Sequence, residues 1–599
     1  MKTEKKNHRQ GGTSCQNCKK DFVIEQEDFN FYEKIKVPAP TWCPECRLIR
    51  RLAYRESRPL YKDICDLCGK EIISIFAESS DVQAYCSSCW WGDNWDALDF
   101  GKDYDFTKSF FEQFYELQKV VPREAVGQKN SENCQYSNGD VRCKNCMLTF
   151  DCFESINCYN SQVAMLSRDS IDVDSVVNSD HSYENFCSND IYNTKFCYFS
   201  DECLDCSFVY KCMGCTNCFG CINLRNQKYC IFNKQYTKEE YEKEIQKWDL
   251  GSYEIIKKAY EEFWELYYKT PRRFAFIKNS TNVSGEDIMN SKNCKNCFFT
   301  RQGVENCKHV FACGLLLKDS YDTTFGGDKS EIFYETSGGM QSQSCFFSRA
   351  PTNSQEIEYS ERVINCFNLF GCVSLRNKQY CILNKQYTKE EYFKIVEKIK
   401  KQMNEIPYID KKGRVYKYGE FFPSELSLWA YNESWGHKYF PLTKEEALEE
   451  GYNWQDSPKR TYQITIKAKD LPNHIKDVTD NILNEVIECD HNDKDCNQQC
   501  TEAFRILPNE LKFYQQMNLS LPRLCPICRH YERLKFMNTI KLHNRTCQCV
   551  GENSENKEYK NTIKHFHGDK PCSNEFETAI GPDRKEIVYC KECYQAEFL

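Results

Sequence analysis

The sequence predicts a multi-domain, mainly β protein in which four small cysteine modules, two at each end, flank a duplicated β-solenoid-like cysteine-rich repeat with interspersed amphipathic helices. Three observations predict it. Cysteines form CxxC pairs near both ends, a ten-residue stretch near the start recurs in similar form 482 positions later, and a 24-residue stretch in the middle recurs at an offset of 151 with 18 identical residues. At 599 residues the chain is too long for one hydrophobic core, so several domains are expected.

The composition indicates the cellular compartment, and the compartment decides how the cysteines are interpreted. The net charge is -8, the pI is about 5.9 and the mean hydropathy is -0.71, which gives no global sign of a nucleic-acid or membrane protein. No apolar run approaches the roughly 20 residues of a membrane helix, and the first residues, MKTEKKNHRQGG, lack the apolar core of a signal peptide. We therefore expect a cytoplasmic protein without membrane contact. In a reducing compartment, dense cysteines are metal ligands or small core residues rather than disulfides.

The 40 cysteines are unevenly distributed, with eight before residue 90, ten after residue 488 and 22 between these groups. The first eight form two sets, each made of two CxxC pairs. Four thiolates in two such pairs suit tetrahedral zinc, because each CxxC turn directs both sulfurs at one ion. The predicted zinc ligands of modules 1 and 2 are Cys15, Cys18, Cys43 and Cys46, and then Cys65, Cys68, Cys86 and Cys89.

Module 3 repeats module 1. CPECRLIRRL at 43–52 corresponds to CPICRHYERL at 525–534, and the match extends back to Cys18 and Cys500 without a gap. The first knuckle is changed to CxxxC, so the fourth ligand is open: Cys496 is preferred, with Cys489 or His491 as rivals. The predicted ligands of module 3 are Cys496, Cys500, Cys525 and Cys528.

Module 4 repeats module 2 less completely. YCSSC in module 2 corresponds to YCKEC in module 4, but the position that matches Cys65 is Asp569. Another residue must complete the site; Cys549 is preferred, with Cys547 and His567 as rivals. The predicted ligands of module 4 are Cys549, Cys572, Cys590 and Cys593. Together the modules predict about four structural zinc ions.

These motifs resemble treble-clef zinc fingers. Modules 1 and 3 are similar to a zinc-binding treble-clef family with CxxC, a hairpin rich in Phe and Tyr, and then PxxCxxCR. Module 2 resembles the small CxxC-x17-CxxC family, and module 4 resembles a diverged copy of it. The whole chain is also similar to a family of long cysteine-rich bacterial proteins. The resemblance implies zinc and a fold, but it supplies no reaction.

The middle of the chain carries the second kind of repeat. CFGCINLRNQKYCIFNKQYTKEEY at 218–241 recurs as LFGCVSLRNKQYCILNKQYTKEEY at 369–392, and each copy closes a region with cysteine steps of three and six. Such steps do not fit a helix, and the segments are rich in Asn, Ser, Asp, Tyr and Phe. We expect the turns of a parallel β-solenoid with cysteines as core; further metal binding by these cysteines is the alternative.

Helices and connectors complete the expected order of segments. Thr237, Thr388 and Thr443 each precede a Glu by three residues, which is the capping box of a helix start. Apolar spacing also predicts helices over about 105–119 and 253–268. The expected segments are zinc module 1 (1–58), zinc module 2 (59–100), a helical linker (101–129), solenoid repeat A (130–235), a helical connector (236–285), solenoid repeat B (286–387), a helix (388–404), an aromatic connector (405–488), zinc module 3 (489–545) and zinc module 4 (546–599).

Charge differs between the modules. Residues 1–62 carry a net charge of +6 and residues 500–549 carry +5, whereas residues 130–230 carry -6. Basic residues follow the last ligand pair of modules 1 and 3, where they could contact phosphates. Pairing with the acidic solenoid is the equal alternative. The candidate nucleic-acid-binding residues are Arg47, Arg51, Arg55, Arg529, Arg533 and Lys535.

Signs of catalysis are few. The sequence contains no GxxxxGK[ST], GxGxxG, HExxH or GxSxG motif, and of the ten histidines only His565 and His567 cluster near cysteines. We expect a non-enzymatic, multi-zinc binding or scaffold protein that presents its solenoid to a protein partner. The alternative is an RNA- or ribosome-associated protein that contacts phosphates through its arginines. A hydrolase with an open zinc site in module 4 is third. The partner, protein or RNA, and the oligomeric state stay undecided.

Overall fold

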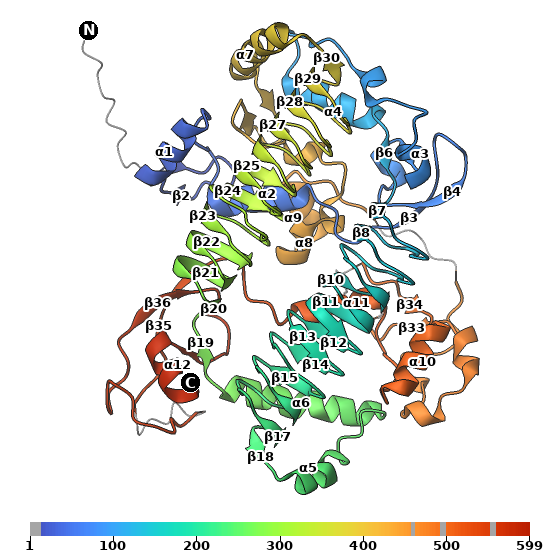
Figure 1. The fold of residues 1–599 in the computed structure, drawn as a ribbon, viewed down its shortest axis with the longest axis vertical. Coiled ribbons are helices and arrows are strands. Elements are labelled where there is room, and N and C mark those ends of the chain that lie inside the picture. The colour runs from blue at the N-terminus through green and yellow to red at the C-terminus, as the bar shows by residue number, and fades with distance from the viewer. Residues whose placement is uncertain (1–12, 457–461, 492–498, 552–558) are drawn as a thin grey trace. The chain divides into compact units, whose positions relative to one another are not determined.

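The computed structural model describes residues 13–456, 462–491, 499–551 and 559–599. The chain forms two compact units, each assembled from distant segments. Unit 1 contains residues 1–125, 275–455 and 540–542; unit 2 contains 126–274, 456–539 and 543–599. Each unit therefore holds one solenoid and two cysteine modules: unit 1 has modules 1 and 2 with repeat B, and unit 2 has modules 3 and 4 with repeat A (Figure 1).

The solenoid of unit 2 is built from short parallel strands. Consecutive turns pair at a spacing of 12 residues, as in Cys218 with Cys230 and Thr216 with Lys228. The strands are β7 (Gln128–Lys129), β8 (Asp140–Val141), β9 (Ile156–Tyr159), β10 (Gln162–Met165), β11 (Arg168–Asp180), β12 (Tyr183–Phe186), β13 (Asn189–Tyr192), β14 (Lys195–Tyr198), β15 (Ser207–Tyr210), β16 (Thr216–Phe219) and β17 (Lys228–Ile231). The prediction of a β-solenoid is confirmed.

The three-residue cysteine steps follow from the backbone. In a typical turn every third residue has a left-handed conformation, for example Asn145, Leu148, Asp151, Glu154 and Asn157, with φ between 50° and 56°. Asn and Asp tolerate this conformation better than other non-glycine residues. The residue after each left-handed position is the one that points into the solenoid. Cysteines that follow such positions are therefore separated by three or by a multiple of three.

The solenoid interior is packed with cysteine and serine. The Cys206 thiol donates to the carbonyl oxygens of Leu204, at 3.3 Å, and Cys215, at 3.5 Å. Ser188 Oγ donates to the Phe186 carbonyl and accepts from the Ser200 backbone N–H one turn later. Small side chains with weak donors thus satisfy backbone groups inside a narrow core. Most of the central cysteines are buried in this core, as the sequence predicts.

Asparagines form a ladder along one corner of repeat A. Each Nδ2 donates to the Oδ1 one turn later, from Asn133 to Asn145 at 3.0 Å, then to Asn157 at 3.2 Å, and finally to Asp169 at 2.8 Å. An amide is both a donor and an acceptor, whereas a carboxylate only accepts. The ladder therefore ends where Asp replaces Asn.

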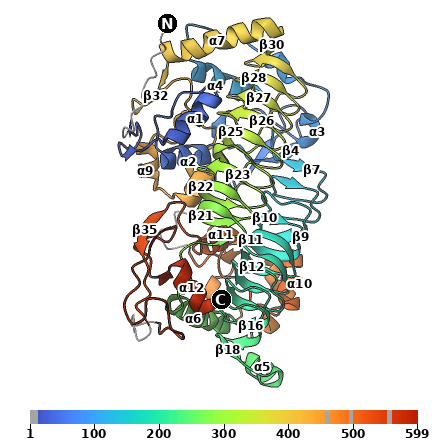
Figure 2. The same ribbon diagram turned by 60° about the vertical axis from the view of Figure 1, so that its left-hand side comes forward.

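The solenoid of unit 1 has the same plan with some longer turns. Tyr321 pairs with Lys308 and Tyr334, each 13 residues away, and the extra residue forms consecutive left-handed positions such as Leu315 and Leu316. Figure 2 shows its strands stacked in order. They are β20 (Ile277–Lys278), β21 (Thr281–Met289), β22 (Lys292–Thr300), β23 (Glu305–Lys308), β24 (Tyr321–Thr324), β25 (Glu331–Ser337), β26 (Gln343–Phe346), β27 (Gln355–Glu358), β28 (Phe367–Phe370) and β29 (Gln379–Ile382).

The duplicated stretch closes each solenoid. Asn384 Oδ1 accepts from the Val373 N–H at 2.8 Å and its Nδ2 donates to the Val373 carbonyl at 2.9 Å; Asn233 makes the same pair of contacts with Ile222. The last strands pair antiparallel with β18 (Lys234–Gln235) and β30 (Lys385–Gln386). The asparagines satisfy backbone groups of the last turn, so the stretch ends the sheet.

Helices follow and precede the solenoids. α5 (Lys238–Ile245) and α7 (Lys389–Glu405) begin at the predicted capping boxes, as does α9 (Lys444–Glu449). α6 (Tyr253–Lys269) lies where expected, and α4 (Phe110–Val120) begins later than predicted because Ser109 caps it. No helix within the described ranges is both long enough and apolar enough to cross a membrane.

Each cysteine module contains a β-hairpin and at least one helix. Module 1 contains β1 (Thr13–Ser14), β2 (Asp21–Phe22), α1 (Gln26–Lys34) and α2 (Pro44–Ala53). Module 3 contains β33 (Ile487–Glu488), β34 (Ala503–Phe504), α10 (Pro508–Gln516) and α11 (Pro526–Leu534). Module 2 contains β3 (Tyr61–Ile64), β4 (Glu71–Ser74), β5 (Ala84–Tyr85) and α3 (Ser87–Trp90), and module 4 contains β35 (His543–Thr546), β36 (Glu575–Thr578), β37 (Val588–Tyr589) and α12 (Lys591–Phe598).

The connectors also differ between the two units. Residues 405–455 belong to unit 1 and contain β31 (Tyr408–Ile409), β32 (Val415–Tyr416) and α8 (Trp435–Tyr439), with buried aromatic rings such as Phe421 and Trp429. Described residues from 456 to 488 belong to unit 2. The segment expected as one aromatic connector therefore serves two cores. In both units a short strand after a helix pairs in parallel with a module strand, β6 (Arg123–Glu124) with β5 and β19 (Arg272–Arg273) with β37.

Candidate metal centres

Among the described residues, four groups of four cysteines bring their sulfurs together, each with all ligand atoms within 4.8 Å of one another. Sulfur–sulfur distances in the groups include 3.8 Å (Cys18–Cys43), 3.9 Å (Cys68–Cys86), 3.9 Å (Cys500–Cys525) and 4.0 Å (Cys572–Cys590). With Zn–S bonds of about 2.3 Å, a tetrahedral zinc holds its sulfurs about 3.8 Å apart. The groups therefore match the geometry of a zinc site with four thiolates.

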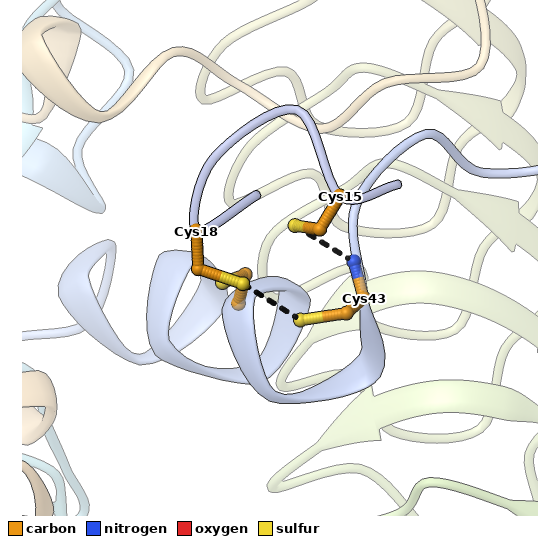
Figure 3. Close-up of side chains that lie close together, drawn as sticks. Cys15, Cys18 and Cys43 are labelled. Atoms are coloured by element: carbon orange, nitrogen blue, oxygen red, sulfur yellow. Dashed lines mark hydrogen bonds between the residues drawn. The ribbon is translucent and has the colours of Figure 1, made fainter. Parts of the chain in front are cut away.

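The local structure that positions the sulfurs is the same in each module. The first cysteine follows a hairpin strand, and the third is the N-cap of a helix. The backbone N–H of the third cysteine donates to the sulfur of the first: Cys43 to Cys15, Cys86 to Cys65 and Cys525 to Cys489 at 3.2 Å, and Cys590 to Cys547 at 3.1 Å. Figure 3 shows Cys15, Cys18 and Cys43 turned toward one another. Helix N-termini favour thiolates, so the fold supports the anionic form of these sulfurs.

The ligand groups of modules 1 and 2 contain the eight cysteines predicted from the sequence. The cysteines of module 1 are buried or half-buried, and Cys68 of module 2 is exposed. Thiolate is the ligand that zinc prefers in closed structural sites. These positions are therefore metal-compatible.

In module 3 the group of four sulfurs contains Cys489, which the sequence offered as an alternative to the preferred Cys496. Cys489 follows β33 just as Cys15 follows β1, and both hairpins pair in the same way. The segment between the strands is longer in module 3, so a comparison without gaps does not align Cys489 with Cys15. Cys496 lies outside the described residues, and His491, the other rival, lies 4.0 Å from Glu532.

Module 4 completes its four-cysteine group with Cys547 in place of the preferred Cys549. Thr546 pairs with Glu575 as Ile64 pairs with Glu71, so Cys547 occupies the place of Cys65. A long insertion separates Cys547 from Cys572, where module 2 has only two residues between its cysteines. Asp569, which the gapless comparison placed opposite Cys65, lies within that insertion. Cys549 belongs to a neighbouring group with His565, His567 and Cys593.

The arginines proposed for phosphate binding are mostly buried against the solenoids. In unit 1, Arg47 of α2 donates to Asp322 at 2.8 Å, and Arg51 lies 3.4 Å from Asp322 and 3.0 Å from Glu335. In unit 2, Arg529 of α11 lies 2.8 Å from Asp172, and Arg533 lies 3.2 Å from Asp172 and 3.3 Å from Glu184. The four arginines have at most 3% of their surface exposed. They attach each module to its own solenoid.

The same attachment includes matching aromatic contacts. Tyr32 of α1 lies 5.4 Å from Tyr334, and Tyr514 of α10 lies 5.7 Å from Tyr183, measured between ring centroids. Figure 1 shows α2 beside β24 and β25 and α11 beside β11 and β12. Equivalent side chains of the two modules thus contact equivalent turns of the two solenoids.

The two remaining candidate residues differ from the other four. Arg55 is half-buried, with its guanidinium carbon 4.4 Å from the centroid of the Phe325 ring. Lys535 is exposed and lies 2.6 Å from Glu532 on the same helix. Arg50, which is not among the six candidates, is fully buried between Glu335 and Glu420. The row of arginines on α2 could have pointed to Arg50. Its two partners could not be found in this way, because they lie hundreds of residues away in the sequence.

The two ion-pair clusters differ in charge balance. In unit 1 Arg47, Arg50 and Arg51 face Asp322, Glu335 and Glu420. Burial raises the pKa of Asp322, but Arg47 and Arg51 outweigh it, so the pKa lies below its ordinary value. In unit 2 Arg529, Arg533 and His530 face four carboxyl groups, those of Asp172, Asp174, Glu184 and Glu510. Burial there raises the pKa of Glu184 to about 8 and that of Glu510 to about 7, against the lowering effect of the arginines.

Unit 2 also contains a pocket of about 790 Å³ beside this cluster. Its wall includes Tyr198 of the solenoid, Trp264 of α6 and Phe536 after α11, whose ring is stacked on both at 3.7 Å and 4.8 Å. Lys257 and Tyr268 lie at the pocket with exposed side chains. Pockets of this size, with aromatic walls and a few polar groups, are typical binding sites.

Comparisons with known proteins add little. No protein-family model and no curated protein matches the chain. The solved structure of a candidate acetyltransferase from Desulfovibrio desulfuricans aligns with 48% of this chain and 86% of its own, with 10% identity and a TM-score of 0.10. A TM-score of this size supports no conclusion about fold or activity.

Proposed function

We propose that the protein is a non-enzymatic, multi-zinc binding protein in which treble-clef modules brace two solenoids. The observation that carries this proposal is the duplicated attachment through Arg47 and Arg51 in unit 1 and through Arg529 and Arg533 in unit 2. Their charged groups are directed at solenoid carboxylates, so the helices that follow the zinc ligands act as internal supports. A buried pair that loses one partner is strongly destabilising, which suits a structural role.

The metal centres have the chemistry of structural sites. Four thiolates fill the coordination of tetrahedral zinc, so a water molecule has no position at which it could be activated. With Cys547, module 4 has such a set as well. This counts against the hydrolase alternative, which depended on an incomplete site. The zinc ions would instead supply free energy of folding.

The RNA-binding alternative receives less support from the geometry. Phosphate binding requires accessible cations, and four of the five arginines on which it rested, Arg47, Arg51, Arg529 and Arg533, are buried in ion pairs. The direct test is the ratio of absorbance at 260 and 280 nm for protein purified with zinc at low salt. We expect the ratio of protein alone; a nucleic-acid signal that disappears with a high-salt wash would favour the alternative.

For the binding site we propose the 790 Å³ pocket of unit 2, and for its occupant an aromatic or aliphatic side chain of a protein partner. The pocket joins solenoid, α6 and α11 residues. Its walls are rich in stacked rings, and such rings contribute strongly to protein interfaces. The solenoid would then present a binding surface, as the sequence analysis expects.

A phage-displayed random peptide library, selected on the zinc-loaded full chain, tests this site. We expect enrichment of peptides with an aromatic or aliphatic residue, and at least tenfold weaker binding to a Tyr268→Ala variant. Tyr192→Ala is the matched control, because Tyr192 is an exposed solenoid tyrosine that does not line the pocket. Equal binding to both variants, or no enrichment, would contradict the proposed site.

A further inference from the structure

Module 4 contains a second set of ligand atoms beside its four-cysteine group. Cys549, His565, His567 and Cys593 place one sulfur or nitrogen each within 4.8 Å of the others. Cys593 is common to both sets, since it also belongs with Cys547, Cys572 and Cys590. The two sets therefore adjoin at one sulfur atom. Three of these four residues are buried and His567 is half-buried.

The outer hydrogen bonds of both histidines orient a ring nitrogen toward sulfur. His567 Nδ1 lies 2.6 Å from the Lys570 carbonyl oxygen, which can only accept, so Nδ1 carries the proton. In the neutral ring Nε2 then presents a lone pair, and it lies 3.3 Å from Cys593 Sγ. His565 Nε2 lies 3.0 Å from the buried Glu597 carboxylate, and its Nδ1 lies 3.2 Å from Cys549 Sγ. Metal-binding histidines characteristically make such outer contacts to a carboxylate or carbonyl.

The sulfur of Cys549 accepts a hydrogen bond, which favours its thiolate form. Asn561 Nδ2 donates to it at 3.2 Å, and the Tyr589 hydroxyl holds Asn561 by donating to its Oδ1 at 2.7 Å. A thiolate and two imidazole lone pairs then converge with Cys593 in a buried space. Such a set of acceptors is costly without a cation among them.

We infer that module 4 holds a binuclear zinc centre in which the Cys593 thiolate bridges the two ions. One ion takes Cys547, Cys572, Cys590 and Cys593; the second takes Cys549, His565, His567 and Cys593. Two Zn²⁺ ions with five thiolates and neutral imidazoles carry a single negative charge, whereas an isolated zinc with four thiolates carries two. Sharing one sulfur thus reduces the charge that the module must stabilise.

The position of the second set explains why module 4 differs from module 2. Cys549, His565 and His567 all lie in the insertion between Cys547 and Cys572, and module 2 has no corresponding residues. The insertion therefore brings its own ligands and takes only the bridging sulfur from the original module. The inferred content is five zinc ions per chain, one more than the four-cysteine groups alone.

Native mass spectrometry of the full chain, purified with zinc, tests the stoichiometry. We expect five zinc ions in the wild type and four in the double variant His565→Ala/His567→Ala. The matched control is His543→Ala, which lies in the same module outside the ligand sets and should keep five. Four ions in the wild type would overturn the inference and leave the proposed function intact, whereas fewer than four would contradict both.

A measurement on the wild type alone tests the bridge, even if the double variant does not fold. Replacement of zinc by Co²⁺ gives paramagnetic ions, and a shared thiolate couples the spins of two of them. We expect five Co²⁺ ions to bind, with a low-temperature magnetic susceptibility equal to that of three uncoupled ions. Five uncoupled ions would contradict the bridging role of Cys593.

Discussion

The guanidinium of Arg529 lies 2.8 Å from the carboxylate of Asp172, and Arg47 makes the same contact with Asp322, also at 2.8 Å. The equivalence extends to Arg533 and Arg51, each of which also contacts the acidic residue of the next solenoid turn, Glu184 or Glu335. The two units are therefore copies of one assembly. The N-terminal modules pack on the second solenoid and the C-terminal modules on the first, which accounts for the duplicated stretches at both ends of the chain.

Removal of Asp172 should destabilise unit 2. In an Asp172→Ala variant Arg529 loses its short ion pair and Arg533 loses one of its carboxylate partners. Because loss of a partner from a buried ion pair is strongly destabilising, we expect a loss of up to about 3 to 5 kcal/mol. Urea unfolding followed by hydrogen exchange should show the loss in unit 2. Lys535→Ala, a change of an exposed residue on the same helix, should alter stability by less than about 0.5 kcal/mol. Equal effects of both variants would contradict the role of the ion pairs.

Cys489 should be a zinc ligand and Cys496 should not. A Cys489→Ser variant is expected to lose one zinc ion, because the remaining three sulfurs bind the metal much more weakly. Elemental analysis of the purified chain measures the loss. The Cys496→Ser variant provides the control within the same knuckle and should keep the wild-type zinc content; loss of zinc there would contradict the assignment.

The central cysteines should be core residues and not ligands. Cys206 is buried and donates to two carbonyl oxygens, so Cys206→Ala should keep the full metal content. We expect a loss of about 1 kcal/mol in the free energy of unfolding, because a small buried group is removed. A lower metal content in this variant would instead indicate a metal site inside the solenoid.

The stability of unit 2 should fall as the pH rises from about 5 to 8. Burial raises the folded-state pKa of Glu184 to about 8, above its ordinary value of 4.5, so the folded state binds this proton more tightly than the unfolded state. The resulting stability is complete at low pH and is lost as the pH rises through 8. Urea unfolding at several pH values measures the slope. A Glu184→Gln variant should flatten it, and an unchanged slope would contradict the assignment.

The sequence predicted the local features well. The capping boxes at Thr237 and Thr388 and the β-solenoid depend on nearby residues, and these predictions are confirmed. The CxxC pairs of modules 1 and 2 come together in groups of four that could hold a metal ion, as their spacing predicts. The positions of Cys489 and Cys547, each directly after a hairpin strand, could not be found by comparing the modules without gaps. Modules 3 and 4 contain insertions after these cysteines, and the motif does not restrict the length of such insertions.

Long-range partners were beyond the sequence patterns. Asp172 and Glu184 are 12 residues apart, one solenoid turn, but both lie in an acidic repeat with many equivalent carboxylates. Which of them faces α11 depends on how module 3 packs, and that contact joins segments more than 300 residues apart. The sequence could therefore predict that basic modules pair with acidic solenoids, but it could not predict which arginine contacts which carboxylate.

The most direct test of the account is hydrogen exchange of the full chain with zinc and after its removal by a chelator. The modules should lose their fold without metal, so the arginines would no longer be held against the solenoids. We predict faster exchange in α2 and α11 and in the turns they cover, 322–335 and 172–184. Unchanged protection of these turns after complete loss of zinc would show that the metal-bound modules do not support the solenoids, and would contradict the account.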